Sequence, residues 1–325
     1  MKKWMMATAV TMLIAAALPA RATDLKLLSA WDNTNAPAWL MVTNYVKLVS
    51  QLSGGKLNIK ISGPQVVPPF EQLQPVSSGV FDMLFQHGVY HAGSKGLALA
   101  FDGFDPDPIA RRAAGLNDYL DKYYQKNNNL KVLAINTQGS FMLVLRQPLT
   151  PEGDLKGRKI RGTTNYKGLV ESLGASLVVL PIADTYSALE RGVVDGAATA
   201  AQGMISLRWN EVTKYRLRPT FGAVTVPIFI NMNRWNKLTK QEQSILEEAG
   251  RLNELQVYWL VRQMQLKEEK DLDKLGMSYQ FLPADKASKL DSVYAQGIHE
   301  LAEKCCGKEA QELRKLAADA GLTDK

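Results

Sequence analysis

A stretch rich in cations poses the first chemical question of this sequence. Residues 154–165 read D-L-K-G-R-K-I-R-G-T-T-N, and their four cations are Lys156, Arg158, Lys159 and Arg161. Arg161 ends the strand-like segment K-I-R just before a polar turn, whereas the other three cations fit a solvated face. Arginine carries a planar fork of donors that can bind a carboxylate through two parallel hydrogen bonds. Arg161 is therefore a candidate anion ligand at the carboxyl end of a strand, where ligand sites of open α/β sheets lie.

The histidines and cysteines offer little metal chemistry. His87 and His91 have the spacing of one helix face, but Gly88 lies between them in a predicted loop. His87 follows a predicted strand, so it can line a cleft or be an ordinary surface or packed histidine. Cys305 and Cys306 are adjacent, and a disulfide between neighbours is strained and rare, so no disulfide framework is expected. Because the sequence has no CxxC motif and no Cys/His cluster, we predict no metal site.

The motifs of common enzymes are missing. The sequence contains no G-x-S-x-G elbow, no P-loop and no H-E-x-x-H, and the glycines of G-V-V-D-G at 192–196 do not form a dinucleotide fingerprint. An exported hydrolase with His87 as its base is the remaining enzymatic alternative, but no nucleophile pairs obviously with His87. We therefore predict no catalytic residues and no cofactor.

The first 22 residues have the pattern of a secretory signal peptide. Lys2 and Lys3 precede an apolar run from Met5 to Leu18, and Ala20-Arg21-Ala22 has the form of a cleavage site. The run is shorter than the roughly 20 residues that a membrane span needs, so a membrane anchor is the weaker alternative. We predict cleavage after Ala22 and export of the mature protein, for which the resemblance given below implies the periplasm. The remaining basic charge is mild and dispersed, which argues against a nucleic-acid partner.

Strand-like runs alternate with helical patterns along the rest of the chain. A strand at 24–31 is followed by a helix at 38–52 and an alternating strand at 57–62. This order and spacing predict parallel β-α-β units. A charge-rich helical pattern from Thr239 to about Leu275 begins with T-K-Q-E, which fits a capping box. Its length suggests an element that spans two domains.

The pattern predicts an α/β protein of two lobes, between which the chain crosses near residues 138–141 and 224–226. We expect lobe I to contain residues 23–138 plus 225–265. Lobe II is expected to contain residues 139–224 plus 266–325, with the C-terminal helices. A ligand site is expected in the cleft between the lobes.

Several motifs stand in a distinctive order and spacing along the mature chain. They are L-K-G-R-K-I-R at 155–161, S-A-L-E-R-G-V-V-D-G at 187–196, S-S-G-V-F-D-M at 77–83, W-N-E-V-T-K-Y at 209–215 and I-N-M-N-R-W-N-K-L-T at 230–239. In these motifs, and over essentially its whole length, the mature chain resembles the DctP-type periplasmic solute receptors of TRAP (tripartite ATP-independent periplasmic) transporters.

The resemblance implies a type II-like periplasmic-binding-protein fold with a ligand cleft between the lobes and a long spanning helix. It implies a receptor that delivers a small organic acid to the small and large integral membrane permease subunits of a TRAP transporter. A monomer is expected, with a helix-swapped dimer as the alternative. A receptor with the same fold that reports to a membrane sensor kinase is the alternative function.

The resemblance also implies roles for single residues. Arg161 matches the arginine that grips the ligand carboxylate, and Thr199 stands where many members have an asparagine. Phe141 stands where receptors of the sialic-acid type have another arginine. An aromatic ring in place of that cation favours a monocarboxylate, aromatic or aliphatic, such as a 2-oxo or hydroxy acid, over a sugar acid.

The remaining candidates for ligand contact lie in the loops and turns after predicted strands. The alternative for Trp31 is a position in the hydrophobic core. The alternative for Asn33 and Asn35 is a role in a turn or as the cap of the next helix. The full set of further candidates is Trp31, Asn33, Asn35, Gln86, His87 and Tyr90 from lobe I, with Thr164 and Gln202 from lobe II.

Overall fold

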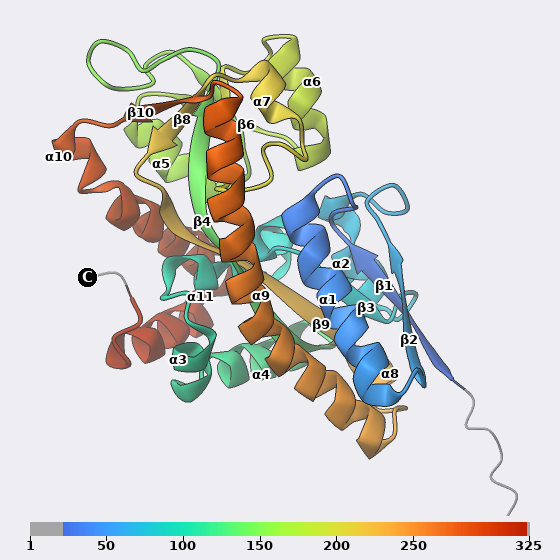
Figure 1. Ribbon diagram of the computed structural model, residues 1–325. Helices are drawn as coiled ribbons and strands as arrows, with labels where there is room; N and C mark the ends of the chain where they lie inside the picture. The colour runs from blue at the N-terminus through green and yellow to red at the C-terminus, as the bar shows by residue number, and fades with distance from the viewer. Residues whose placement is uncertain (1–21, 324–325) are drawn as a thin grey trace, which may run out of the picture.

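The computed structural model describes residues 22–323, which form two α/β lobes (Figure 1). Except for Ala22, the predicted signal peptide lies outside the described residues. Within residues 22–323, none of the helices combines the length and the apolar character that a membrane crossing needs.

The first lobe is built on three parallel strands, with β1 between β2 and β3. β1 is buried along most of its length because Leu25, Leu27 and Leu28 all point into the core. The elements of this lobe are β1 (Thr23–Ser29), α1 (Ala36–Ser53), β2 (Leu57–Ser62), η1 (Pro69–Glu71), α2 (Leu73–Ser77), β3 (Met83–Phe85), η2 (Gly88–Ser94), η3 (Leu97–Gly103), α3 (Pro108–Ala113), α4 (Leu116–Asn128) and α8 (Met232–Trp235).

The second lobe contains the parallel strands β7, β5 and β6, in that spatial order. The carboxyl ends of these strands face the first lobe. Its elements are β5 (Lys159–Gly162), η4 (Thr164–Tyr166), α5 (Lys167–Ser172), β6 (Ser176–Val179), η5 (Ile182–Asp184), α6 (Thr185–Glu190), β7 (Gly196–Ala200), α7 (Trp209–Val212), β8 (Tyr215–Arg218), β10 (Ser278–Phe281) and α10 (Ala284–Ala287).

Two long strands join the lobes into one sheet of order β2-β1-β3-β9-β4-β7-β5-β6. They are β4 (Leu130–Leu145) and β9 (Phe221–Asn231), which pair antiparallel and pass through both lobes. Their register shifts on both sides of Gly139, whose φ of +100° is one that glycine adopts readily. The predicted crossing at 138–141 therefore falls on the irregular part of β4, and the crossing at 224–226 lies opposite it on β9.

The predicted spanning helix is α9 (Lys240–Lys274), which begins with the expected capping box between Thr239 and Glu242. It runs along both lobes (Figure 1) and is hydrogen-bonded to each. In the first lobe the buried carboxylate of Glu254 accepts from the N–H of Ile135 at 2.5 Å. In the second, the carboxylate of Glu268 accepts from the N–H groups of Gly203 and Ile205 at 2.6 and 2.9 Å. One continuous helix is thus tied to both lobes.

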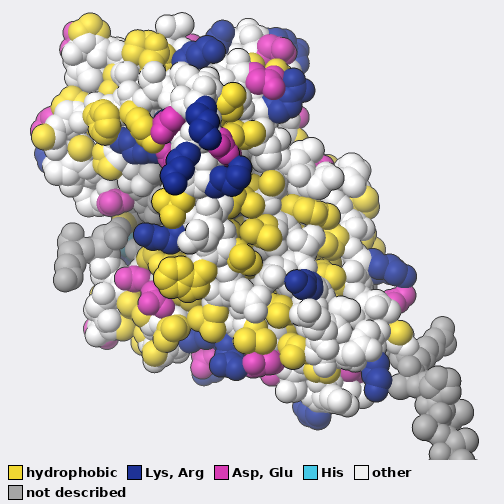
Figure 2. Space-filling model, in the orientation of Figure 1, with side chains coloured by type: hydrophobic (Ala, Val, Ile, Leu, Met, Phe, Trp, Pro, Cys, Tyr) yellow, Lys and Arg dark blue, Asp and Glu magenta, His cyan; other side chains and the backbone are white. Residues whose placement is uncertain are grey.

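The face of the molecule that α9 crosses is mixed in character. Figure 2 shows hydrophobic side chains over its middle and dispersed Lys, Arg, Asp and Glu side chains around them. The exposed hydrophobic residues on α9 are Trp259, Leu260 and Leu266.

The C-terminal helix α11 (Leu290–Asp319) requires a correction to the expected lobe boundaries. It contacts α5 and η4 in the second lobe, but it also packs against η3 and α4 in the first. Hydrogen bonds follow the same division, because Tyr294 accepts from Asn165 while Tyr119 donates to Glu312. Residues 266–325 therefore do not all belong to lobe II, since α11 lies across both lobes.

The two cysteines depart from expectation. Cys305 and Cys306 form a disulfide inside α11, although a bond between neighbouring cysteines is rare. The bond closes no long loop, so the fold still has no disulfide framework linking distant elements in the described residues.

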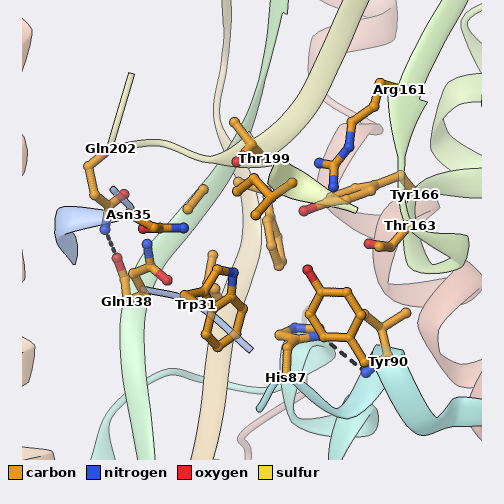
Figure 3. A pocket seen from close by; sticks show the side chains of 15 residues that line it. Trp31, Asn35, His87, Tyr90, Gln138, Arg161, Thr163, Tyr166, Thr199 and Gln202 are labelled. Carbon is orange, nitrogen blue, oxygen red and sulfur yellow. Dashed lines mark hydrogen bonds between the residues drawn. The ribbon is translucent and has the colours of Figure 1, made fainter. Parts of the chain in front are cut away.

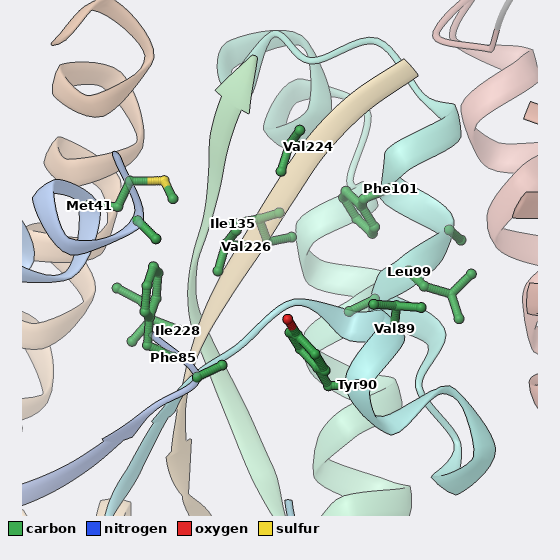
Figure 4. Close-up of a cluster of buried hydrophobic side chains, with 14 of the residues drawn as sticks. Met41, Phe85, Val89, Tyr90, Leu99, Phe101, Ile135, Val224, Val226 and Ile228 are labelled. Atoms are coloured by element: carbon green, nitrogen blue, oxygen red, sulfur yellow. The ribbon is translucent and has the colours of Figure 1, made fainter. Parts of the chain in front are cut away.

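The main hydrophobic core lies on both faces of the shared strands. Ile135 of β4 and Val226 of β9 are buried between α1 on one side and η2 and η3 on the other (Figure 4). Met41 projects from α1, while Leu99 and Phe101 come from η3. The core thus packs the first-lobe helices directly against the strands that continue into the second lobe.

We predict that Glu254→Ala destabilises the protein. The substitution leaves Arg112, Asn117 and the N–H of Ile135 without their acceptor in a buried site. Because Arg112 is partly exposed, we expect the free energy of unfolding to fall by about 2–4 kcal/mol in urea denaturation.

The matched control is Glu248→Ala on the same helix. Glu248 pairs with Arg251 at the surface, so its removal should change stability by less than about 0.5 kcal/mol. Equal effects of the two substitutions would contradict the anchoring role of Glu254.

Candidate functional site

A closed pocket lies between the lobes and draws its lining from both (Figure 3). Its space of about 50 Å³ would hold only a few water molecules, because one buried water needs about 10–15 Å³. The lining residues are Trp31, Asn35, His87, Val89, Tyr90, Gln138, Phe141, Arg161, Thr163, Tyr166, Ile182, Thr199, Ala200, Gln202 and Val224.

Arg161 reaches this pocket from β5 and is 3% exposed. Its Nε and one terminal nitrogen donate to the carbonyl of Leu180 at 3.0 and 2.7 Å, and the other donates to Ala198 O at 3.2 Å. The guanidinium also lies over the ring of Trp209, 6.0 Å from its centroid. These neutral partners fix the position of the fork on the second lobe.

The charge of Arg161 has no acidic partner within ion-pair distance among residues 22–323. Burial lowers the pKa of Arg161, because water no longer stabilises its charged form. A buried cation is normally paired, so the pocket is electrostatically suited to an anion that enters from outside.

Two tyrosines stand near Arg161. Burial raises the pKa of Tyr90 and of Tyr166, and the neighbouring charge of Arg161 offsets part of the rise. Both phenols therefore remain protonated at neutral pH and can donate hydrogen bonds. Tyr90 belongs to the first lobe and Tyr166 to the second, so the two donors approach the pocket from opposite sides.

Aromatic rings form one wall of the pocket. Phe141 lies 5.2 Å from Tyr166, 5.4 Å from Tyr294 and 6.0 Å from Phe221, measured between ring centroids. On the first lobe, Trp31 lies 5.9 Å from Tyr90. Trp31 is 7% exposed, so it is both a core residue and a pocket residue, and the two sequence readings were not exclusive.

His87 is paired with a carboxylate that sequence reasoning missed. Its Nε2 lies 2.8 Å from Oδ2 of Asp102, and its Nδ1 accepts from the N–H of Val89. That acceptance places the ring proton on Nε2, facing Asp102. Asp102 also accepts from the hydroxyl of Thr225 at 2.7 Å. His87 lines the pocket, but both of its nitrogens face protein partners.

Three predicted site residues do not line the pocket. Asn33 is exposed, and Gln86 is buried behind the pocket, where it contacts Pro69, Gln72 and His91. Thr164 is exposed at the start of η4, and the neighbouring Thr163 lines the pocket instead. Side chains alternate along an extended chain, so Thr163 shares a face with Arg161. The alternation of side chains every two residues, counted from Arg161, could have identified Thr163 from the sequence.

The other candidates meet at the pocket. Asn35 caps α1 by accepting from the N–H of Ala38 at 3.3 Å, and it also lines the pocket. Thr199 and Gln202 come from the end of β7 and the turn that follows it. Gln138 and Tyr166 were missed, because neither carries a local signal: one lies at the register shift of β4 and the other in a 3₁₀ turn.

No group of three or more His, Cys, Asp or Glu side chains suited to a metal ion occurs in the part of the chain that the structure describes. His91 lies in the core, where its ring nitrogens pair with Gln86 at 2.8 Å and the hydroxyl of Tyr124 at 2.7 Å. His87 and His91 thus have separate partners, and the pair does not form a metal site.

Comparison with known proteins places the fold and the site in context. Residues 28–304 match DctP, the bacterial extracellular solute-binding protein family 7. The outer membrane transporter protein TsaT of Comamonas testosteroni is 27% identical over 255 residues, 74% of this chain and 75% of its own. A monocarboxylate 2-oxoacid-binding periplasmic protein of Nostoc is 25% identical over 214 residues, 62% of this chain and 58% of its own.

A TRAP periplasmic solute-binding protein of Desulfovibrio salexigens, solved with bound orotic acid, superimposes with a TM-score of 0.80. It is 19% identical, and the match covers 91% of this chain and 98% of that one. Two lobes, a spanning helix and an interlobe pocket define the class of TRAP periplasmic solute receptors. The chain belongs to the DctP family of these receptors, which bind small organic acids and are not enzymes.

His91 gives a prediction for pH dependence. Burial lowers the pKa of His91 to about 3, against about 6.5 in the unfolded chain. The unfolded state therefore binds the extra proton first, and stability present above pH 6.5 is lost as the pH falls. Between pH 6.5 and 3 this residue should remove about 1.4 kcal/mol of unfolding free energy per pH unit.

The measurement compares urea denaturation of the native protein and His91→Gln at pH 7, 6 and 5. The variant should show the flatter pH dependence, even if it is less stable at pH 7. If the unfolding free energies of the two proteins changed equally with pH, His91 would not be the source of this pH dependence.

Proposed function

We propose that this protein is the receptor of a TRAP transporter for a small monocarboxylate. It captures the acid outside the cytoplasm and delivers it to the small and large integral membrane permease subunits. The predicted signal peptide, residues 1–22, supports a periplasmic location.

The observation that carries the proposal is the buried guanidinium of Arg161. It has neutral hydrogen-bond partners and no acidic partner within the described residues, so a carboxylate in the pocket would compensate its charge. Arginine and a carboxylate form charge-assisted hydrogen bonds of matching planar geometry. The phenols of Tyr90 and Tyr166 would add donors to the same anion.

The pocket wall supports a cargo with one acid group. Phe141 and Tyr166 supply aromatic surface to the lining, and no lysine or second arginine lines the pocket. The Nostoc relative is named for monocarboxylate 2-oxoacids, and the D. salexigens structure holds orotic acid. These names support a small organic acid as the cargo class for this chain.

Cargo binding would couple to lobe closure. Arg161 approaches the pocket from one lobe and Tyr90 from the other, so an acid held between them favours the closed arrangement. The shared strands β4 and β9 would absorb the rotation near Gly139. Helix α9 is hydrogen-bonded to both lobes of its own chain through Glu254 and Glu268. These contacts support a monomer over a helix-swapped dimer.

The proposal is tested by a thermal-shift screen of carboxylic acids, followed by calorimetry on the acids that raise the melting temperature. Arg161→Ala should weaken binding of such an acid by about 3 kcal/mol, since its carboxylate would be buried without a partner. Lys159→Ala is the matched control, because Lys159 is exposed on the same strand.

Unchanged affinity in Arg161→Ala would reject Arg161 as the carboxylate ligand. A screen in which uncharged analogues bind as tightly as acids would reject the proposed cargo class itself. Melting of each variant without cargo distinguishes loss of binding from loss of folding.

A further inference from the structure

The pocket has two chemically different ends (Figure 3). Arg161, Thr163 and Tyr166 gather at one end, which we call the cationic end. The side chains of Asn35, Gln138 and Gln202 gather at the other, the amide end. The amide end offers hydrogen-bonding groups without a formal charge, so it suits a neutral polar group rather than a second carboxylate.

The orientation of Gln202 is fixed by its neighbour. Gln202 is 1% exposed, and its Nε2 donates to the backbone carbonyl of Gln138. The reversed amide would bring two acceptor oxygens together, so the donor must face Gln138. The side-chain oxygen Oε1 is therefore directed away from that carbonyl.

Gln202 Oε1 is buried and has no hydrogen-bond partner among the described residues. A buried acceptor without a donor is unfavourable, and native proteins rarely retain one without a reason. Among the pocket-lining residues, the other buried polar atom without a hydrogen bond is His87 Nε2, which has the carboxylate of Asp102 2.8 Å away. Gln202 Oε1 has no such neighbour.

We propose that Gln202 Oε1 accepts a hydrogen bond from an O–H or N–H group of the cargo. The receptor then selects monocarboxylates that carry a donor group as well as the acid. This inference rests on the proposed function and narrows its substrate class. The carboxylate occupies the cationic end, and the donor group occupies the amide end.

Asn35 completes the recognition of the second group. Its Oδ1 accepts from the N–H of Ala38, which leaves its Nδ2 as the atom that can donate to cargo. A hydroxyl group can accept from Asn35 and donate to Gln202 at once. The oxygen of an oxo group only accepts, so it would oppose the lone pairs of Gln202 Oε1. A hydroxy acid, or a ring acid with an N–H group, fits better than an oxo acid.

The test uses acids of equal skeleton that differ in the donor. The probes are 2-hydroxybutanoate with 2-oxobutanoate, and 4-hydroxypentanoate with 4-oxopentanoate. Calorimetry on the native protein should show that, in the best-bound pair, the hydroxy acid binds about tenfold more tightly or better. This comparison needs no variant, so it is unaffected by misfolding.

The second measurement repeats the calorimetry of the best-bound pair on the Gln202→Met variant. The affinity ratio should fall to within about twofold, because methionine offers no comparable acceptor. Gln51→Met is the control, since Gln51 is exposed on α1 far from the pocket lining, and it should keep the native ratio.

The results separate this inference from the function on which it rests. If the oxo acids bind as tightly as their hydroxy partners, or if the affinity ratio is unchanged in Gln202→Met, the role of Gln202 is overturned while the monocarboxylate receptor stands. If no acid of the panel or of the wider screen binds the native protein, both proposals fall together.

Discussion

The organisation of this receptor depends on keeping one guanidinium charged inside a nearly closed pocket. Removing a charge from water is unfavourable, and Arg161 is compensated only in part by the carbonyls of Leu180 and Ala198. Leu180 directly follows β6 and Ala198 lies within β7, so the parallel strands of the second lobe hold the guanidinium in place. In the proposed function, the carboxylate of the cargo would compensate the remaining charge and so stabilise the closed state.

The two lobes are connected by elements that differ in stiffness. β4 and β9 pair through both lobes, yet their register is irregular around Gly139. Helix α9 is regular throughout and fixed to each lobe by a carboxylate. The strands thus provide a position where rotation is easy, while the helix keeps the lobes facing each other.

The sequence predicted the parts of the site that depend on local order. Arg161 could be found because a strand end is visible as K-I-R before a polar turn, and the two lobes follow from alternating strands and helices. Residues that depend on tertiary placement could not be found in this way. Asp102 meets His87 only because η3 folds against β9, and Gln138 enters the pocket through the irregular part of β4.

The errors have the same origin. Gln86 follows a strand, as a ligand residue should, but the turn into η2 directs it toward Gln72 and His91. The C-terminal helices were expected in the second lobe, whereas α11 packs across both lobes. Neither the direction of a turn nor the partner of a C-terminal helix is encoded in local spacing.

The two carboxylate ties of α9 have a mechanical consequence. Any separation of the lobes that preserves both ties must curve the helix between Glu254 and Glu268. That segment carries Trp259, Leu260 and Leu266 toward solvent on one face and buries Val257 and Val261 in the main core on the other. A helix that resists this curvature opposes separation of the lobes, so its elasticity favours the return of an opened receptor to the closed arrangement.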